Sequence, residues 1–185
     1  MKKPNARERI LETASELFHR RGYSEVGINE IIAKAETAKA SFYQHYPSKE
    51  VLCEAWLSHL HERSEAGRKA ILESQSSPAE KVEAYFDHLS AFMHESDFRG
   101  CPYSNTGAVS DEGCQGIVRE IRGHKQSIRD FFHKICREAF SNSERADQIG
   151  DRIFLLYSGA AIEAQNLRED WPILAAREAA VEMLA

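Results

Sequence analysis

The sequence predicts an all-α protein of about nine helices, in which three N-terminal helices precede a larger helical bundle. Apolar residues recur at spacings of three and four along most of the 185 residues, as on one face of a helix. Clusters of Gly, Pro and Ser interrupt that pattern at helix-length intervals. No stretch shows the apolar–polar alternation of a half-buried strand.

The first predicted helix begins after Asn5 and ends at Gly22. Asn5, followed three residues later by Glu8, is a capping signal, and Gly is common just beyond a helix end. Its buried face comprises Ile10, Leu11, Ala14, Leu17 and Phe18. Two short helices joined by a tight turn are predicted next, over about 28–35 and about 38–46.

The later helices are predicted to be longer. One opens at 47–50, with Pro in the first turn where its missing N–H costs no hydrogen bond, and runs to a break at 74–78. Residues 99–116 are the least regular because they contain four Gly and one Pro. The other predicted helices cover about 78–94, about 117–141, about 145–168 and the residues after 171–172. The predicted domains are a helix-turn-helix domain at 1–46 and a second domain at 47–185.

Charge is unevenly distributed along the chain, whose net charge is −5. Residues 1–50 hold 9 Lys/Arg and 7 Asp/Glu, whereas residues 51–185 hold 15 and 22. A mildly basic head on an acidic body suits a protein that finds DNA without binding it everywhere.

The remaining composition indicates a reduced cytoplasmic protein without cofactor, metal or membrane span. The four cysteines form no Cys-x-x-Cys pair, and no His spacing typical of zinc occurs. His124 and His133 are expected to face solvent. No run reaches the roughly 18 apolar residues of a spanning helix, and no apolar segment follows the N-terminal charges.

The second short helix carries an unusual density of polar groups. Lys39, Ser41, Tyr43, Gln44 and His45 lie within two turns. Small, hydroxyl and cationic side chains on one short helix suit a helix that enters a DNA groove.

On its N-terminal residues the chain resembles the TetR/AcrR family of one-component transcriptional repressors. The matching residues are Gly22-Tyr23, Ile31, Ala33, Lys39, Tyr43, His45, Pro47-Ser48-Lys49-Glu50 and Leu52. The resemblance implies a homodimer that binds a palindromic double-stranded DNA operator. It also implies release by a small-molecule effector bound in the C-terminal domain, and no enzymatic activity.

The resemblance also implies a division of labour at the DNA. Lys39, Ala40 and Ser41 would face the bases, while Tyr43, His45 and Lys49 would contact phosphates. Asn29, Thr37 and Gln44 complete the predicted DNA-binding set.

Three positions depart from the family pattern. Glu36 stands where the family usually has a helix-ending Gly, Ala38 where it has a capping Ser, and Ala40 where it often has Gly. Thr37 is expected to replace the missing cap. These differences predict an altered turn and an atypical operator; the alternative is a helix-turn-helix kept only as a structural module.

The resemblance implies that the last two long helices pair with those of a second copy. The predicted helix after Arg145 carries a stripe of apolar and small residues, and Ser158–Ala161 would allow close helix approach. The same residues could instead form an internal core.

Two effector hypotheses remain open for the C-terminal domain. The first is a pocket for an apolar or aromatic compound, with walls from Leu89, Phe92, Met93, Tyr103, Phe131, Phe154, Tyr157 and Gln165, and with Asn105 among its polar groups. The alternative for these residues is plain core packing.

The second hypothesis is a thiol sensor at Cys101. The segment Arg99–Asn105 resembles one in a TetR subgroup that senses electrophiles and oxidants. Cys101 would sit at a helix N-terminus, and Cys114 could resolve an oxidised Cys101. The lysine near the reactive cysteine of that subgroup appears here as Gln165, so an activating cation is expected to be absent. A buried, inert thiol is the alternative, and a thiol hydrolase using Cys101 is a remote one without a catalytic signature.

Overall fold

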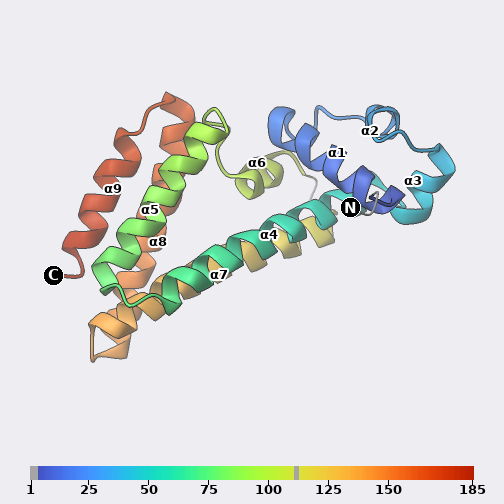
Figure 1. Cartoon of the computed structure of the whole chain (residues 1–185). Coiled ribbons are helices and arrows are strands. Elements are labelled where there is room, and N and C mark those ends of the chain that lie inside the picture. Colours follow the sequence, from blue (N-terminus) through green and yellow to red (C-terminus); the bar gives the residue numbers. More distant parts are fainter. Residues whose placement is uncertain (1–3, 111–112) are drawn as a thin grey trace. The chain divides into compact units, whose positions relative to one another are not determined.

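The structure, a computed structural model, describes residues 4–110 and 113–185. Within these residues it contains nine helices and no strand (Figure 1), which confirms the predicted fold class. The helices are α1 Ala6–Arg21, α2 Ile28–Lys34, α3 Lys39–His45, α4 Lys49–Glu73, α5 Pro78–Glu95, α6 Pro102–Val109, α7 Gln115–Ala139, α8 Ser143–Leu167 and α9 Trp171–Glu182. None of them is both long and apolar enough to cross a bilayer.

The chain divides into two compact units. The first comprises the residues up to Glu62 together with 102–122, and the second comprises 63–101 and 123–185. Helices α4 and α7 each contribute residues to both units. The predicted boundary at 46/47 lies within the first unit, which also includes the start of α4 and all of α6.

Local signals in the first unit act as predicted. The Asn5 side chain accepts a hydrogen bond from the Glu8 N–H at 3.0 Å, and the Glu8 carboxylate accepts one from the Asn5 N–H at 2.8 Å. Gly22 ends α1 with a φ of 93°, a conformation that favours glycine. The ring of Phe18, on the buried face of α1, packs against the Trp56 ring of α4, with 5.2 Å between the ring centres. Helix α1 is thus fixed at both ends and along one face.

The turn between α2 and α3 is a Schellman motif built on a non-glycine residue. The Thr37 N–H donates to the Ile32 carbonyl at 3.2 Å, and the Glu36 N–H donates to the Ala33 carbonyl at 3.3 Å. Glu36 has a φ of 48°, in the left-handed region that a side chain disfavours. Arg9 of α1 binds this turn from outside, through hydrogen bonds to the carbonyls of Ala35 and Glu36.

Two capping expectations for the next helices were wrong. The residue before α3 is Ala38, and among the described residues no side chain caps this helix, so Thr37 does not replace the missing serine. Helix α4 begins at Lys49, and the Ser48 hydroxyl accepts a hydrogen bond from the Val51 N–H. Pro47 therefore precedes α4 rather than lying in its first turn.

The strained turn yields a stability prediction. Replacing Glu36 with Gly is expected to raise the free energy of unfolding by about 1 kcal/mol, because glycine adopts positive φ without steric cost. Urea denaturation measures the change. The Glu36→Ala variant, which removes the charge but keeps the Cβ, is the control and should gain nothing. Equal stability of the Gly and Ala variants would contradict the assignment of strain.

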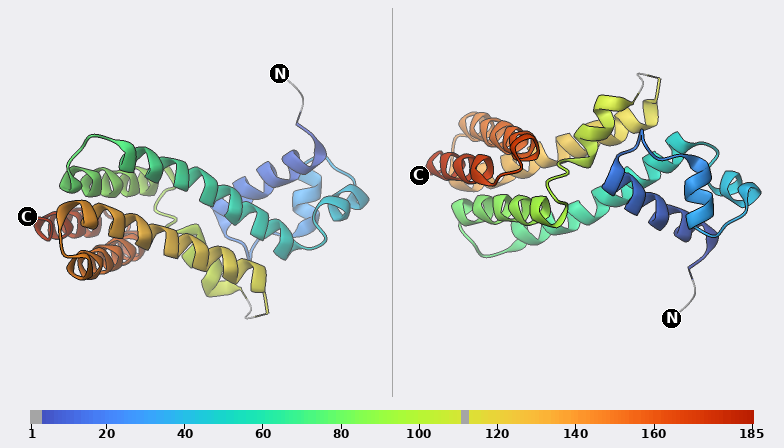
Figure 2. Two further views of the ribbon diagram at one scale, coloured as in Figure 1. Left: turned by 90° about the horizontal axis from the view of Figure 1, so that it is seen from below. Right: turned by 90° about the horizontal axis from the view of Figure 1, so that it is seen from above.

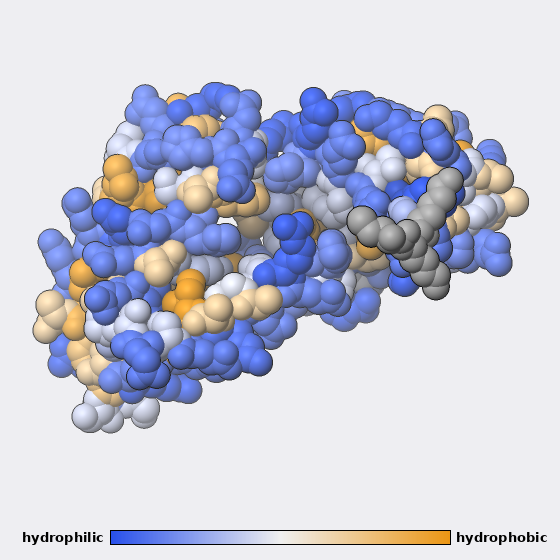
Figure 3. Space-filling model, viewed as in Figure 1, coloured by the Kyte–Doolittle hydropathy of each residue, from blue (hydrophilic) through white to orange (hydrophobic). Residues whose placement is uncertain are grey.

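In the second unit, α5, α8 and α9 lie side by side around one apolar core (Figures 1 and 2). Its largest buried side chains include Phe86, Phe132 and Met93. At the rim, the buried amine of Lys81 reaches the carboxylate of Glu138 at 2.6 Å, which keeps its charge paired. The face in Figure 3 is largely hydrophilic, with apolar residues in separate patches.

The expectation that His124 and His133 face solvent was wrong, since both are buried. The His133 ring lies against Gly150 of α8, where a Cβ would be only 2.6 Å from it. The ring Nε2 lies 2.7 Å from a carboxylate oxygen of Asp151. Arg129 donates two hydrogen bonds to the same carboxylate and, as the main cause, lowers the pKa of Asp151 to about 2. The histidine is buried because a glycine on the facing helix makes room for it.

Candidate functional site: a DNA-reading helix and an effector domain

Helix α3 is anchored by one buried ring and exposes its other faces. Phe42 is fully buried, and Tyr46 just after the helix is also buried, with its hydroxyl donating to the Arg7 carbonyl. The side chains of Lys39, Ala40 and Gln44 are exposed. The helix is therefore held from one side while its polar residues project away.

The polar groups of α3 are available for a ligand. Within residues 4–110 and 113–185, the side chains of Lys39, Ser41, Gln44 and His45 form no hydrogen bond or ion pair. The Tyr43 ring is 41% exposed and packs edge-on against Phe42 at 5.3 Å. An amine, a hydroxyl, an amide, an imidazole and a phenol thus lie within two turns of one helix, the set that base edges and phosphates require.

Asn29 and Thr37 flank this surface. Asn29 is exposed on α2, and Thr37 lies partly exposed in the turn before α3. Neither side chain forms a hydrogen bond within the part of the chain that the structure describes.

Lys49 is placed differently from the other predicted contacts. Its amine lies 4.4 Å from the centre of the Tyr23 ring and donates to the Ser24 carbonyl at 3.4 Å. Burial, as the main cause, lowers the pKa of Lys49. Lys49 thus ties the start of α4 to the loop after α1, a role that the sequence did not indicate; its phosphate contact stays a prediction.

The predicted effector residues are divided between the two units. Leu89, Met93 and Phe131 are buried in the core of the second unit, and Phe92, Phe154 and Tyr157 are partly buried against it. Tyr103, Asn105 and Cys114 belong to the first unit. The Tyr103 hydroxyl donates to the Leu57 carbonyl at 2.8 Å, which satisfies this buried group without a ligand.

Cys101 has a cation that the sequence did not reveal. It immediately precedes α6, as predicted, and its sulfur lies 3.8 Å from the amine of Lys125 on α7. The expected lack of an activating cation was therefore wrong, because a lysine 24 residues away in sequence supplies it. Gln165 lies beside Gly100, where a Cβ would be 1.9 Å from its side-chain oxygen.

The other thiols differ in their surroundings. Cys53 and Cys136 are fully buried, and burial raises the pKa of each to about 12. Cys114 is partly buried in the first unit.

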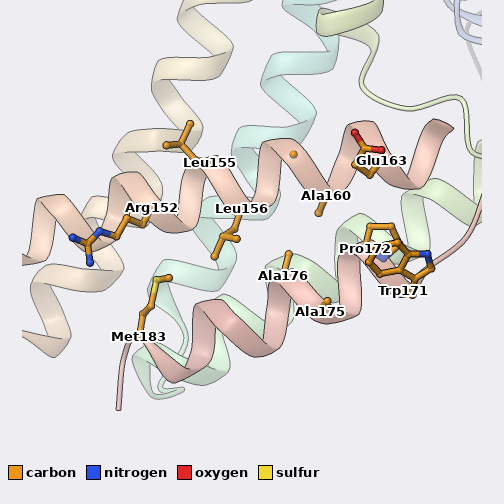
Figure 4. A pocket seen from close by; sticks show the side chains of 11 residues that line it. Arg152, Leu155, Leu156, Ala160, Glu163, Trp171, Pro172, Ala175, Ala176 and Met183 are labelled. Atoms are coloured by element: carbon orange, nitrogen blue, oxygen red, sulfur yellow. The ribbon is translucent and has the colours of Figure 1, made fainter. Parts of the chain in front are cut away.

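An apolar groove runs along the surface of α8 and α9 (Figure 4). Its volume is about 630 Å³, and its lining residues are mostly apolar, with Arg152 and Glu163 as the charged ones. Leu155 and Trp171 at its edges are 66% and 56% exposed. The lining residues are Arg152, Leu155, Leu156, Gly159, Ala160, Glu163, Trp171, Pro172, Ala175, Ala176 and Met183.

Comparison of the sequence with known proteins places the α1–α4 region in a family. Residues 10–56 match the model of the bacterial regulatory proteins of the tetR family. The transcriptional regulator LmrA of Bacillus subtilis is 25% identical over 92% of each chain. The transcriptional repressor DhaR of a Mycobacterium species is 28% identical over 94% of this chain and 89% of its own. NemR, a transcriptional repressor of Escherichia coli, is 22% identical over 91% and 88%.

Solved structures agree over nearly the whole chain. A TetR-family transcriptional regulator from Streptomyces coelicolor aligns with a TM-score of 0.82 at 26% identity, covering 97% of this chain and 92% of that one. The reduced form of Escherichia coli NemR aligns with a TM-score of 0.82 at 21% identity over 98% of each chain, which shows a shared fold.

Proposed function

The chain belongs to the TetR family of bacterial transcriptional regulators, and from this premise we propose that it is a homodimeric repressor released from a palindromic operator by a small effector. The main support for the proposal is helix α3. Its Phe42 is buried, and its polar side chains Lys39, Ser41, Gln44 and His45 have no partner among the described residues. A helix of this kind reads base edges in the major groove.

Two copies are needed to read two half-sites. The groove on α8 and α9 is the surface for the second copy, because large apolar side chains such as Leu155 and Trp171 are exposed beside the small residues Gly159 and Ala160. Small residues let helices of the two protomers approach closely. The two α3 helices would then lie about 34–36 Å apart, one turn of B-DNA.

Effector binding would act through a shift between two dimer states. Helix α4 begins in the first unit at Lys49 and continues into the second unit. A ligand that favours one position of α4 would therefore change the spacing of the two α3 helices in the dimer. DNA binding weakens when that spacing no longer matches successive grooves.

Operator binding tests the proposal. Purified protein is mixed with the DNA flanking its own gene, and retarded complexes are measured by electrophoresis between about 50 and 200 mM salt. We expect a specific complex whose affinity falls steeply over this range, because each phosphate contact releases counterions. The proposal would be contradicted if no specific complex formed at the lowest salt, either with this DNA or with any member of a random operator library.

Direct modification of Cys101 is a second candidate mode of release, favoured by the Lys125 amine beside its sulfur. An ammonium group near a thiol stabilises the thiolate, which is the nucleophile. With N-ethylmaleimide, the thiolate sulfur bonds to a carbon of the alkene, and the resulting enolate takes a proton from water. Release of wild type but not of Cys101→Ser by this reagent would distinguish this mode from a reversible ligand.

The cysteines are expected to react in a defined order. Under limiting iodoacetamide, Cys101 labels first, whereas Cys53 and Cys136 stay unlabelled because they are buried and their thiol pKa of about 12 leaves little thiolate. Peptide mass spectrometry after timed quenching measures the order. The Lys125→Met variant should slow labelling of Cys101 but not of the other cysteines. If Cys53 or Cys136 were labelled first, Cys101 would not be the most reactive thiol.

A further inference from the structure

Arg68 on α4 is a buried cation whose hydrogen-bond partners are uncharged. It is 3% exposed, and its guanidinium donates to the hydroxyls of Ser64 at 2.6 Å and Ser127 at 2.7 Å. Among the described residues it forms no ion pair. Buried arginines are ordinarily paired with an acid, since an uncompensated charge in the interior is costly. The second unit therefore holds a positive charge in need of an anion.

Tyr157, whose hydroxyl feels the charge of Arg68, does not supply that anion. Tyr157 lies close enough for the charges of Arg68 and Cys101 to act on its hydroxyl. Burial, as the main cause, raises the pKa of Tyr157 well above its ordinary value, and Arg68 only partly opposes this. The phenol stays protonated beside the guanidinium. The amine of Lys125, a second cation of this unit, lies 3.8 Å from the Cys101 sulfur.

The Tyr157 ring belongs to an apolar cluster, and the next residue of α8 carries an unsatisfied hydroxyl. The Tyr157 ring stacks on Tyr85 at 4.9 Å and meets the edge of Phe86 at 5.6 Å. The adjacent Ser158 hydroxyl is buried and has no hydrogen-bond partner among the described residues. Ser158 lies seven residues before Gln165, so both share a face of α8, the face that packs on Gly100 beside Cys101. Native proteins rarely leave such a group unpaired, which points to a polar ligand atom.

We propose that Arg68 anchors the carboxylate of an organic acid with an apolar body, and that this acid is the effector. The inference rests on the proposed function, since it names the ligand class of the effector domain. A planar carboxylate accepts two parallel hydrogen bonds from a guanidinium, a stronger pairing than the two serine hydroxyls provide. The rings of Tyr85 and Tyr157 would contact the apolar body. Because Arg68 lies on α4, binding of the acid would act directly on the helix that begins in the first unit, after the DNA-reading helix α3.

Thermal denaturation of full-length protein tests the proposal without DNA. The probes are 1-naphthoate and octanoate, each compared with its neutral primary amide, on wild type, Arg68→Met and Arg63→Met. We expect at least one acid, but neither amide, to raise the Tm of wild type by about 3 °C or more. Without ligand, Arg68→Met should melt about 3–8 °C higher, because it removes a buried unpaired charge, and it should lose the response to acid. Arg63→Met, an exposed position on the same helix, should behave as wild type.

Each Tm result either supports or overturns the acid site at Arg68. A response to naphthoate alone identifies an aromatic body, and a response to octanoate alone identifies an aliphatic one. The proposal is overturned if neither acid exceeds its amide, or if Arg68→Met keeps the response. It is also overturned if Arg68→Met melts earlier or fails to fold, since Arg68 would then be a structural tether between α4 and α7. This assay does not depend on operator binding. The acid site could therefore be supported even if the protein bound no operator, and operator binding could be found even if no acid bound.

Discussion

Replacing Gly159 with arginine is expected to convert the protein to a monomer and to weaken operator binding by at least about 100-fold. Gly159 lines the groove on α8 and α9, and within the protomer a Cβ there meets no heavy atom within 4 Å. The new side chain is therefore compatible with the protomer but fills the space where a second copy would pack. A monomer binds one half-site and loses the gain from linking two. Sedimentation equilibrium gives the mass, and a gel shift gives the affinity.

A matched control separates the interface from the substitution itself. Gly67 on α4 is also helical and exposed, and a Cβ at this position would likewise meet no heavy atom within 4 Å, so Gly67→Arg adds the same side chain elsewhere. It should remain dimeric and bind DNA as wild type does. A dimeric Gly159→Arg protein with full operator affinity would show that the groove is not the dimer surface.

Replacing Lys39 with alanine is expected to change which operator sequence is preferred. Lys39 is the first residue of α3, exposed and without a partner in the described chain, so its amine is available to acceptors on base edges. Its loss should cost about 1–3 kcal/mol per half-site on the wild-type operator and much less on sequences changed at the contacted base pair. Selection from a randomised operator library, followed by sequencing, measures preference and affinity together.

Tyr43→Phe provides the comparison for Lys39. It removes one hydroxyl while the ring keeps its contact with Phe42, so a phosphate contact would be lost without disturbing the helix. Binding should weaken by a similar factor on every sequence. If Lys39→Ala also weakened all sequences equally, Lys39 would be a phosphate contact and base reading would have to come from other residues.

Much of the first unit follows from local signals that the sequence displays directly. The capping box of Asn5 and Glu8, the stop at Gly22 and the apolar face of α1 depend on residues within one helix. The unusual Glu36 was also predictable, because a Schellman turn demands positive φ whatever residue occupies it. The absent cap on α3 was not, because whether Thr37 bonds depends on the path of the turn.

Contacts between distant helices set the limits of prediction at the effector site. The lysine beside Cys101 comes from α7, and no sequence spacing joins positions 101 and 125. Tyr103 and Asn105 were expected among the residues of the C-terminal pocket, yet they belong to the first unit, where Tyr103 of α6 donates to the Leu57 carbonyl of α4. Arg68 gave no signal in sequence, since arginine on a helix is ordinarily solvated and only tertiary packing buries it.

The sequence alone determined the helical class, the order of the helices and the residues of α3 that face outward, because helix periodicity and end signals are short-range. The tertiary structure decided which polar groups are buried and which cations and hydroxyls meet: Lys125 at Cys101, Lys49 at Tyr23, and Arg68 at two serines. The physical reason is that burial and charge pairing depend on which faces of separate helices meet, and residues far apart in the chain determine those faces.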